Sequence, residues 1–250
     1  MNCFIAYFDY LGFKEFIENN DLDYQKKIIG NNFRDLESAL GQGKIKDVHH
    51  GVIADLSNSK INCINFSDTV VFWTNDDSNE SLKELLDVSY KFNWQAVDFF
   101  FPARGSVVYG ELFYVDFKQS NEGGGQYNLN SVFGKGLIKA HLKADSQNWA
   151  GTVLDDSLIS ELARRGLNPD DYLKPYTKKY KVPYKNGIEL PEEFVYSLIT
   201  GHLSDEAFKN YSNNIRENFA SHKKSVDIPG VKEKLENTLN FLASFREEKK

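Results

Sequence analysis

Two strand-like segments, each associated with an aspartate, most constrain the fold of this chain. Residues 61–74 contain two runs rich in Ile, Val, Phe and Trp on either side of Ser67-Asp68-Thr69, which is the pattern of a β-hairpin with a polar turn. Residues 4–8 are uniformly apolar, which is typical of a strand buried on both faces, and Asp9 follows directly. The sequence therefore predicts one aspartate at a hairpin tip and another at the end of a buried strand.

Asp9 and Asp68 would lie close together if these strands were neighbours in one sheet. Two carboxylates about 4 Å apart repel each other by about 4 kcal/mol at an effective dielectric constant near 20. Either one acid is protonated or a cation lies between them, and Mg²⁺ suits oxygen ligands and usually binds together with substrate phosphates. The alternative is purely structural: Asp68 forms a turn and Asp9 caps the next helix. We favour a metal site because both acids end apolar runs.

The composition limits the compartment and the partners. The chain has 250 residues, 41% hydrophobic and 26% charged, so it can bury a substantial core. Its formal net charge of -6 argues against a broad basic surface for nucleic acid, whereas a small anion could still bind through a metal and local cations. The two cysteines, Cys3 and Cys63, lie in predicted strands, which favours a reducing cytoplasm. We expect no signal peptide and no membrane-spanning helix.

Two further segments carry candidate binding residues, and a third is predicted to be flexible. Gly12 follows the first strand and would let the backbone approach a bound group, with the first amides of the next helix facing a triphosphate. Lys139 and Lys143 lie one helical turn apart and could present two positive charges to phosphates, with exposed surface lysines as the common alternative. Residues 116–130 include three successive glycines and are predicted to form a mobile loop.

The remaining pattern alternates between helices and strands up to about residue 168. Helices are predicted at 23–40, 79–101 and 156–165, and strands at 51–54, 103–115 and 152–154. After Pro169 the sequence predicts an irregular connector or ribbon, followed by helices at about 192–221 and 231–249. We therefore expect a first domain, residues 1–168, and a mainly helical C-terminal extension, residues 169–250.

The order of elements is that of an α+β sandwich with a split βαβ, ferredoxin-like core. With its two aspartates, the chain resembles the catalytic domain of class III nucleotidyl cyclases, and most closely the pyrimidine cyclases of the Pycsar antiphage defence system. The resemblance covers about residues 1–167. It rests on Phe8-Asp9-Tyr10-Leu11-Gly12-Phe13, Phe66-Ser67-Asp68-Thr69-Val70-Val71-Phe72, Arg104-Gly105-Ser106-Val107-Val108-Tyr109-Gly110, and Phe133-Gly134 with the helix through Ala140.

The resemblance implies a catalytic role for the two aspartates. Asp9 and Asp68 would hold two divalent cations, Mn²⁺ or Mg²⁺, and the triphosphate would lie against Leu11-Gly12-Phe13, with Arg104 as a further substrate ligand. The ribose 3'-hydroxyl would attack the α-phosphate, releasing pyrophosphate and a 3',5'-cyclic nucleotide. Class III cyclases are dimers with the active site between subunits, so a second copy would complete each site.

The resemblance leaves the base and the transition-state cation open. Purine cyclases carry an Asn and, four residues later, an Arg at positions that spacing aligns with Lys139 and Lys143, whereas a gapless count gives Ile138 and Leu142. Asn62, Ile64 and Ser131 are the nearest equivalents of the base-selecting positions, and none matches the Lys and Asp pair used for adenine. We therefore expect a pyrimidine cyclase.

This enzyme would make cyclic UMP or cyclic CMP in a bacterial cytoplasm as an antiphage signal to a separate effector, without binding nucleic acid or a membrane. The alternatives are a purine cyclase, an inactive cyclase-like nucleotide sensor, and a palm-like polymerase or cyclic-dinucleotide synthase. The last lacks support because the hairpin has no Gly-Gly-Asp/Glu-Glu-Phe turn.

Overall fold

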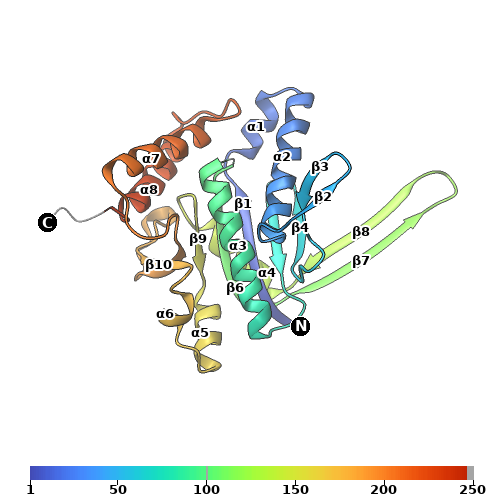
Figure 1. Ribbon diagram of the computed structural model, residues 1–250, viewed down its shortest axis with the longest axis horizontal. Coiled ribbons are helices and arrows are strands. Elements are labelled where there is room, and N and C mark those ends of the chain that lie inside the picture. Colours follow the sequence, from blue (N-terminus) through green and yellow to red (C-terminus); the bar gives the residue numbers. More distant parts are fainter. Residues whose placement is uncertain (100, 247–250) are drawn as a thin grey trace.

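A seven-stranded sheet forms the centre of the molecule (Figure 1). The computed structural model describes residues 1–99 and 101–246. In spatial order the strands are β10 (Thr177–Tyr180), β11 (Glu193–Tyr196), β9 (Gly151–Leu154), β6 (Ala103–Glu111), β1 (Asn2–Tyr10), β5 (Thr69–Trp73) and β4 (Asn62–Phe66). β6 and β9 are parallel, and the other neighbours in this sheet are antiparallel.

β1 is the central strand and is buried on both faces, as its apolar sequence predicts. Phe4, Ala6 and Phe8 point to one face and join the core under α2 (Leu22–Leu40) and α3 (Asn79–Phe99). Cys3, Ile5 and Tyr7 point to the other face, which α4 (Lys135–Asp145) covers. Since side chains alternate along a strand, Asp9 lies on the α4 face.

Of the two alternatives for the start of the C-terminal segment, the ribbon is confirmed, and its two strands extend the central sheet. β11 pairs with β9, and β10 pairs with β11. The helix predicted at 192–221 is wrong at its start, since residues 193–196 are β11. The remaining elements on this side are α5 (Asp156–Arg164), α6 (Pro169–Leu173), the 3₁₀ turn η1 (Lys185–Gly187), α7 (Asp205–Ala220) and α8 (Pro229–Ala243).

α7 and α8 build a second apolar core rather than extending the first one. Trp149, Val195 and Phe241 are buried there together with apolar residues of both helices. The expected boundary at 168/169 falls between strands of one sheet. The division into two folding units stays a prediction.

The loop predicted at 116–130 is wrong: these residues form a long hairpin arm, β7 (Phe113–Ser120) and β8 (Gln126–Phe133), paired in register from end to end. Only the tip, residues 121–125, is a turn, and it contains the three glycines. The strand predicted at 103–115 accordingly ends at Glu111, and the chain leaves the central sheet to enter the arm.

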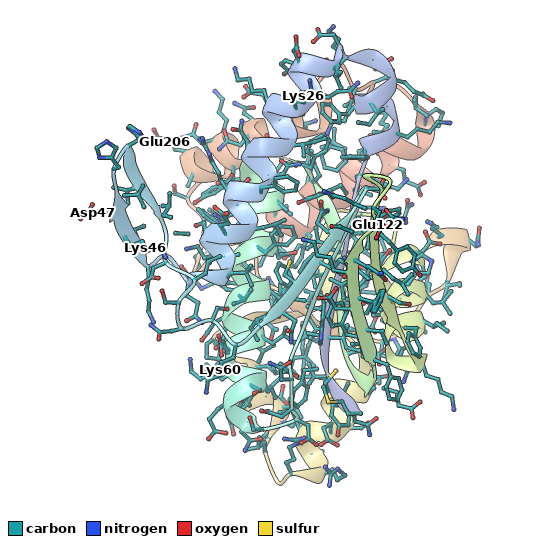
Figure 2. The ribbon with its side chains drawn as sticks, turned by 90° about the vertical axis from the view of Figure 1, so that its right-hand side faces the viewer. Lys26, Lys46, Asp47, Lys60, Glu122 and Glu206 are labelled. Carbon is teal, nitrogen blue, oxygen red and sulfur yellow. The ribbon has the colours of Figure 1, made fainter. Side chains whose placement is uncertain are left out.

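A second small hairpin consists of β2 (Ile45–Val48) and β3 (Gly51–Ala54), of which only β3 was expected. Figure 2 shows Lys46 and Asp47 on this hairpin, away from the central sheet. In the described part of the chain, none of the helices combines the length and the apolar character needed to cross a membrane.

Candidate functional site

The predicted meeting of Asp9 and Asp68 depends on the pairing of β1 with the β4–β5 hairpin, and this pairing is present. Asp9 lies opposite Thr69 in the antiparallel register of β1 and β5. The hairpin turns at Ser67 and Asp68, and Ser67 adopts a positive φ of 56°. The backbone N–H of Tyr10 donates to the carbonyl of Asp68 over 2.9 Å. The two aspartates therefore stand at the same end of adjacent strands.

Asp9 is largely buried and pairs with Arg104, which lies opposite it on β6. Arg104 approaches Oδ2 of Asp9 with Nε at 2.8 Å and Nη2 at 2.7 Å. Burial raises the pKa of Asp9 above its ordinary value, Arg104 opposes this rise, and the nearby charges of Asp68 and Asp145 add to it. Acidic charge is thus concentrated at this edge of the sheet.

Asp145 and Lys185 complete this group, and sequence reasoning missed both. Arg104 donates from Nη1 to the carbonyl of Asp145 over 2.9 Å and from Nη2 to its Oδ1 over 2.7 Å. Nζ of Lys185 lies 2.9 Å from the same carboxylate oxygen, and this contact, followed by Arg104, lowers the pKa of Asp145. Asp145 ends α4, where an acid is unfavourable for the helix dipole. An acid at the C-terminal end of a helix is therefore the sequence signal by which Asp145 could have been found.

The backbone after β1 turns at Gly12, the N-cap of α1 (Phe13–Asn19). Asp9 is therefore not the helix cap that the structural alternative required. The N–H of Leu11 donates to the carbonyl of Pro102 over 2.8 Å, and Phe13 packs against the main core. Gly12 has a φ of 79°, and a Cβ there would lie 2.8 Å from Cδ of Lys224. A side chain of the C-terminal segment thus covers Gly12.

The other predicted ligands lie away from this edge in the single chain. Asn62 stands at the opposite end of the hairpin from Asp68, where its amide donates to Asn75 Oδ1 over 2.8 Å and to the carbonyl of Trp73 over 3.3 Å. Ser131 lies on the arm, opposite Val115. Their predicted contact with the base is therefore not assembled within one chain.

Lys139 and Lys143 share one side of α4, as their spacing predicts, and both are paired. Lys139 is half-exposed, with Nζ 3.9 Å from Asp155. Lys143 is largely buried, with Nζ 2.5 Å from Glu193 and 5.0 Å from the ring centre of Tyr184. Their catalytic role stays a prediction.

The donor set suits a hard divalent cation that also binds substrate. Within residues 1–99 and 101–246, there is no group of three or more His, Cys, Asp or Glu side chains arranged for a metal. Mg²⁺ commonly uses one or two carboxylates and completes its shell with water and phosphate oxygens, which is what Asp9 and Asp68 offer. The residues therefore fit a metal that arrives with a phosphate ligand.

Comparison with solved structures identifies the fold. The guanylate cyclase domain of RhGC from Catenaria anguillulae, solved with GTP, matches with a TM-score of 0.52 and 7% identity over 78% of this chain and 96% of that one. A dimeric guanylyl cyclase domain of the RhoGC fusion protein from Blastocladiella emersonii matches with a TM-score of 0.52 and 6% identity over 78% and 95%. No protein-family model and no curated protein sequence matches. The chain therefore has the α+β fold of class III cyclase catalytic domains.

Proposed function

We propose that this protein is a nucleotide cyclase that converts UTP or CTP into 3',5'-cyclic UMP or cyclic CMP and pyrophosphate. The observation that carries the proposal is the placement of Asp9 and Asp68 at one end of adjacent strands, in a fold shared with guanylyl cyclase domains. Asp9 is not needed as a helix cap, because Gly12 holds that position, and other turn residues would serve at Asp68.

Asp9 and Asp68 would hold two Mn²⁺ or Mg²⁺ ions through their carboxylate oxygens. When bound, these ions supply Lewis-acid activation of the phosphate and charge stabilisation for the attacking oxygen. The backbone of residues 11–13 would lie along the triphosphate. Arg104 would exchange its bond to Asp9 for one to a phosphate oxygen, since guanidinium groups bind both anions in the same planar geometry.

The reaction balances without a further reactant. The 3'-oxygen of the ribose forms a bond to the α-phosphorus, and the bond from that phosphorus to the β-phosphate oxygen breaks. Pyrophosphate leaves, and the proton of the 3'-hydroxyl passes to water. Lys139 and Lys143 are our candidates for the cations that stabilise the transition state. Lys143 would first have to leave Glu193.

The pyrimidine preference rests on the sequence resemblance and on the lack of an adenine-selecting Lys and Asp pair. Asn62 and Ser131 are the candidate base-contacting residues. A purine cyclase is the second candidate, because the Catenaria domain was solved with GTP, and the catalytic core of a rhodopsin-guanylyl cyclase with converted specificity was solved with ATPαS. By the same resemblance, the product would act as an antiphage signal on a separate effector in the cytoplasm.

A homodimer with shared active sites would bring the remaining ligands together. One face of α4 and the arm expose apolar side chains, a surface that favours a protein partner. Ile138 is 60% exposed and Leu142 is 61% exposed. The arm adds Phe113, Val115, Phe117, Leu129 and Phe133. In such a dimer, Lys139 of one copy would face the metal site of the other.

The test is a product assay with matched variants. The purified protein is incubated separately with ATP, GTP, CTP and UTP plus Mn²⁺, and products are identified by mass spectrometry. We expect cyclic UMP or cyclic CMP, a loss of at least about a hundredfold in rate for Asp68→Asn, and an unchanged rate for Asp47→Asn. Asp47 is an exposed carboxylate on the separate β2–β3 hairpin (Figure 2).

The assay also separates the alternatives. Cyclic AMP or cyclic GMP as the main product would establish the purine cyclase instead. Nucleotide binding without any product would favour an inactive sensor. In such a protein, the Asp9–Arg104 ion pair would persist with nucleotide bound. Linear or dinucleotide products would support a polymerase-like enzyme.

A further inference from the structure

The C-terminal segment brings positive charge to the loop that follows β1. Figure 1 shows α7 and α8 beside the end of β1 from which α1 begins. A cavity of about 70 Å³ lies between this loop and the two helices. Leu11 and Gly12 line one side of it, and Lys224 and Lys234 line the other. Two ammonium-bearing side chains therefore adjoin the predicted triphosphate loop.

Lys224 is buried without a hydrogen-bond partner. The residue is only 8% exposed, and in the described chain its Nζ has no hydrogen-bond acceptor. Its ammonium group lies 4.6 Å from the ring centre of Phe101, and its methylene chain covers Gly12. Burying an ammonium group without an acceptor costs several kcal/mol, so such a group indicates an anionic ligand or another functional requirement.

Lys234 is half-buried and stands near two other cations. Its Nζ donates to the carbonyl of Gly230 in its own helix over 3.2 Å. Burial lowers the pKa of Lys234, and the charges of Arg104 and Lys185 lower it further, whereas the charges of Glu233 and Asp145 oppose this change. Lys234 therefore connects the cavity electrostatically with the Asp9 cluster, which consists of Asp9, Asp68, Arg104, Asp145 and Lys185.

Glu15 is the acid that lines the same cavity. Its Oε1 accepts a hydrogen bond from the backbone N–H of Ser225 over 2.9 Å. One carboxylate and two lysine side chains therefore line the cavity, which leaves an excess of positive charge among its lining residues.

We propose that this cavity receives the terminal phosphates of the nucleoside triphosphate, with Lys224 and Lys234 as the phosphate-binding cations. The inference rests on the proposed function and extends it, because it assigns part of the substrate site to the segment after residue 168. Phe219 and Val231 also line the cavity, so its walls are partly apolar. We assign it to a polyphosphate rather than a nucleobase because two lysines lie beside Leu11 and Gly12.

A polyphosphate bound with two divalent ions would leave the charge balance of the site unchanged. Across the Asp9 cluster and the cavity, acidic and basic groups are equal in number: Asp9, Asp68, Asp145 and Glu15 against Arg104, Lys185, Lys224 and Lys234. A nucleoside triphosphate carries roughly four negative charges, which two divalent cations balance. The full complex would therefore bury no net charge.

The experiment measures binding of Mg²⁺-tripolyphosphate by isothermal titration calorimetry, with the full chain at neutral pH. This probe has no base and undergoes no cyclisation, so the result does not depend on activity or base preference. We expect Lys234→Met and Lys224→Met each to weaken binding about tenfold, and Lys234→Arg to retain most of it. Lys232→Met is the control, because Lys232 is exposed on the same helix.

The outcomes distinguish this inference from the proposed function. Unchanged binding in both Lys224→Met and Lys234→Met would overturn the inference, and normal production of a cyclic nucleotide by the wild type would leave the function standing. A wild-type protein that neither binds tripolyphosphate nor makes a cyclic nucleotide would overturn both. An equal loss in Lys232→Met would also overturn the inference, since any lysine on this helix would then serve.

Discussion

Replacing Lys224 by methionine should stabilise the folded protein, although it removes a proposed substrate ligand. Burial lowers the pKa of Lys224 from 10.5 to about 8, and the charge of Glu15 only partly opposes this. This shift in pKa means that the charged form of Lys224 destabilises the folded state by about 3 kcal/mol at neutral pH. Methionine keeps an unbranched chain over Gly12 and contacts aromatic rings favourably, but it loses the attraction of the ammonium for Phe101.

The net gain should be about 2 kcal/mol in the free energy of unfolding at pH 7.5. For a chain of this length, that raises the melting temperature by about 4 to 8 °C. The unfolded chain keeps the proton of Lys224 up to its ordinary pKa, whereas the folded chain loses it near pH 8. The unfolded state therefore binds more protons between these values, and wild-type stability rises with pH there.

The assay is urea unfolding of the wild type, Lys224→Met and Lys232→Met at pH 7.5 and at pH 9.5. The advantage of Lys224→Met over the wild type should shrink by about 2 kcal/mol at the higher pH, because wild-type Lys224 is then mostly neutral in the folded state. Lys232→Met should follow the wild type at both values. A Lys224→Met protein less stable than the wild type at pH 7.5, or an advantage independent of pH, would refute the reasoning.

Three other perturbations test the fold around the site. Gly105→Ala places a Cβ 2.7 Å from both Phe8 and Thr152, so the free energy of unfolding in urea should fall by about 2 kcal/mol. Gly123→Ala at the arm tip has no atom within 4 Å of the added Cβ and should leave this free energy unchanged. Leu142→Glu should convert the expected dimer into a monomer in analytical ultracentrifugation; a persistent dimer would place the interface elsewhere. Truncation after Asn168 removes the strand paired with β9 and should abolish the cooperative thermal transition seen by circular dichroism, so a native-like transition would establish an independent first domain.

The sequence predicted the elements whose pattern has a single physical explanation. Residues 4–8 are apolar at every position, which only a strand covered on both faces accommodates, and this strand is β1. The hairpin at 61–74 was equally clear, because two apolar runs flank a short polar turn. The meeting of Asp9 and Asp68 was predicted only on the condition that these strands are neighbours, and the pairing of β1 with β5 meets that condition.

The arm was mispredicted because it has no buried face. Both of its strands are exposed along most of their length, so the alternation that identifies a half-buried strand is weak. Three glycines at the tip then dominated the local pattern. Similarly, Lys185, Lys224 and Lys234 gave no local signal, since only tertiary packing brings them to the end of β1.

Under the proposed function, Arg104 would link metal binding to nucleotide binding. In the free protein its guanidinium neutralises Asp9 and holds Asp145, so a metal ion alone must compete with an ion pair that is already formed. A metal that arrives with a triphosphate instead gives Arg104 a phosphate oxygen in exchange for the carboxylate. Lys234 would then gain an anion as well, which would offset its repulsion by Arg104 and Lys185. Under the proposed function, neither ligand binds well alone, and the acids and the C-terminal lysines act as one site.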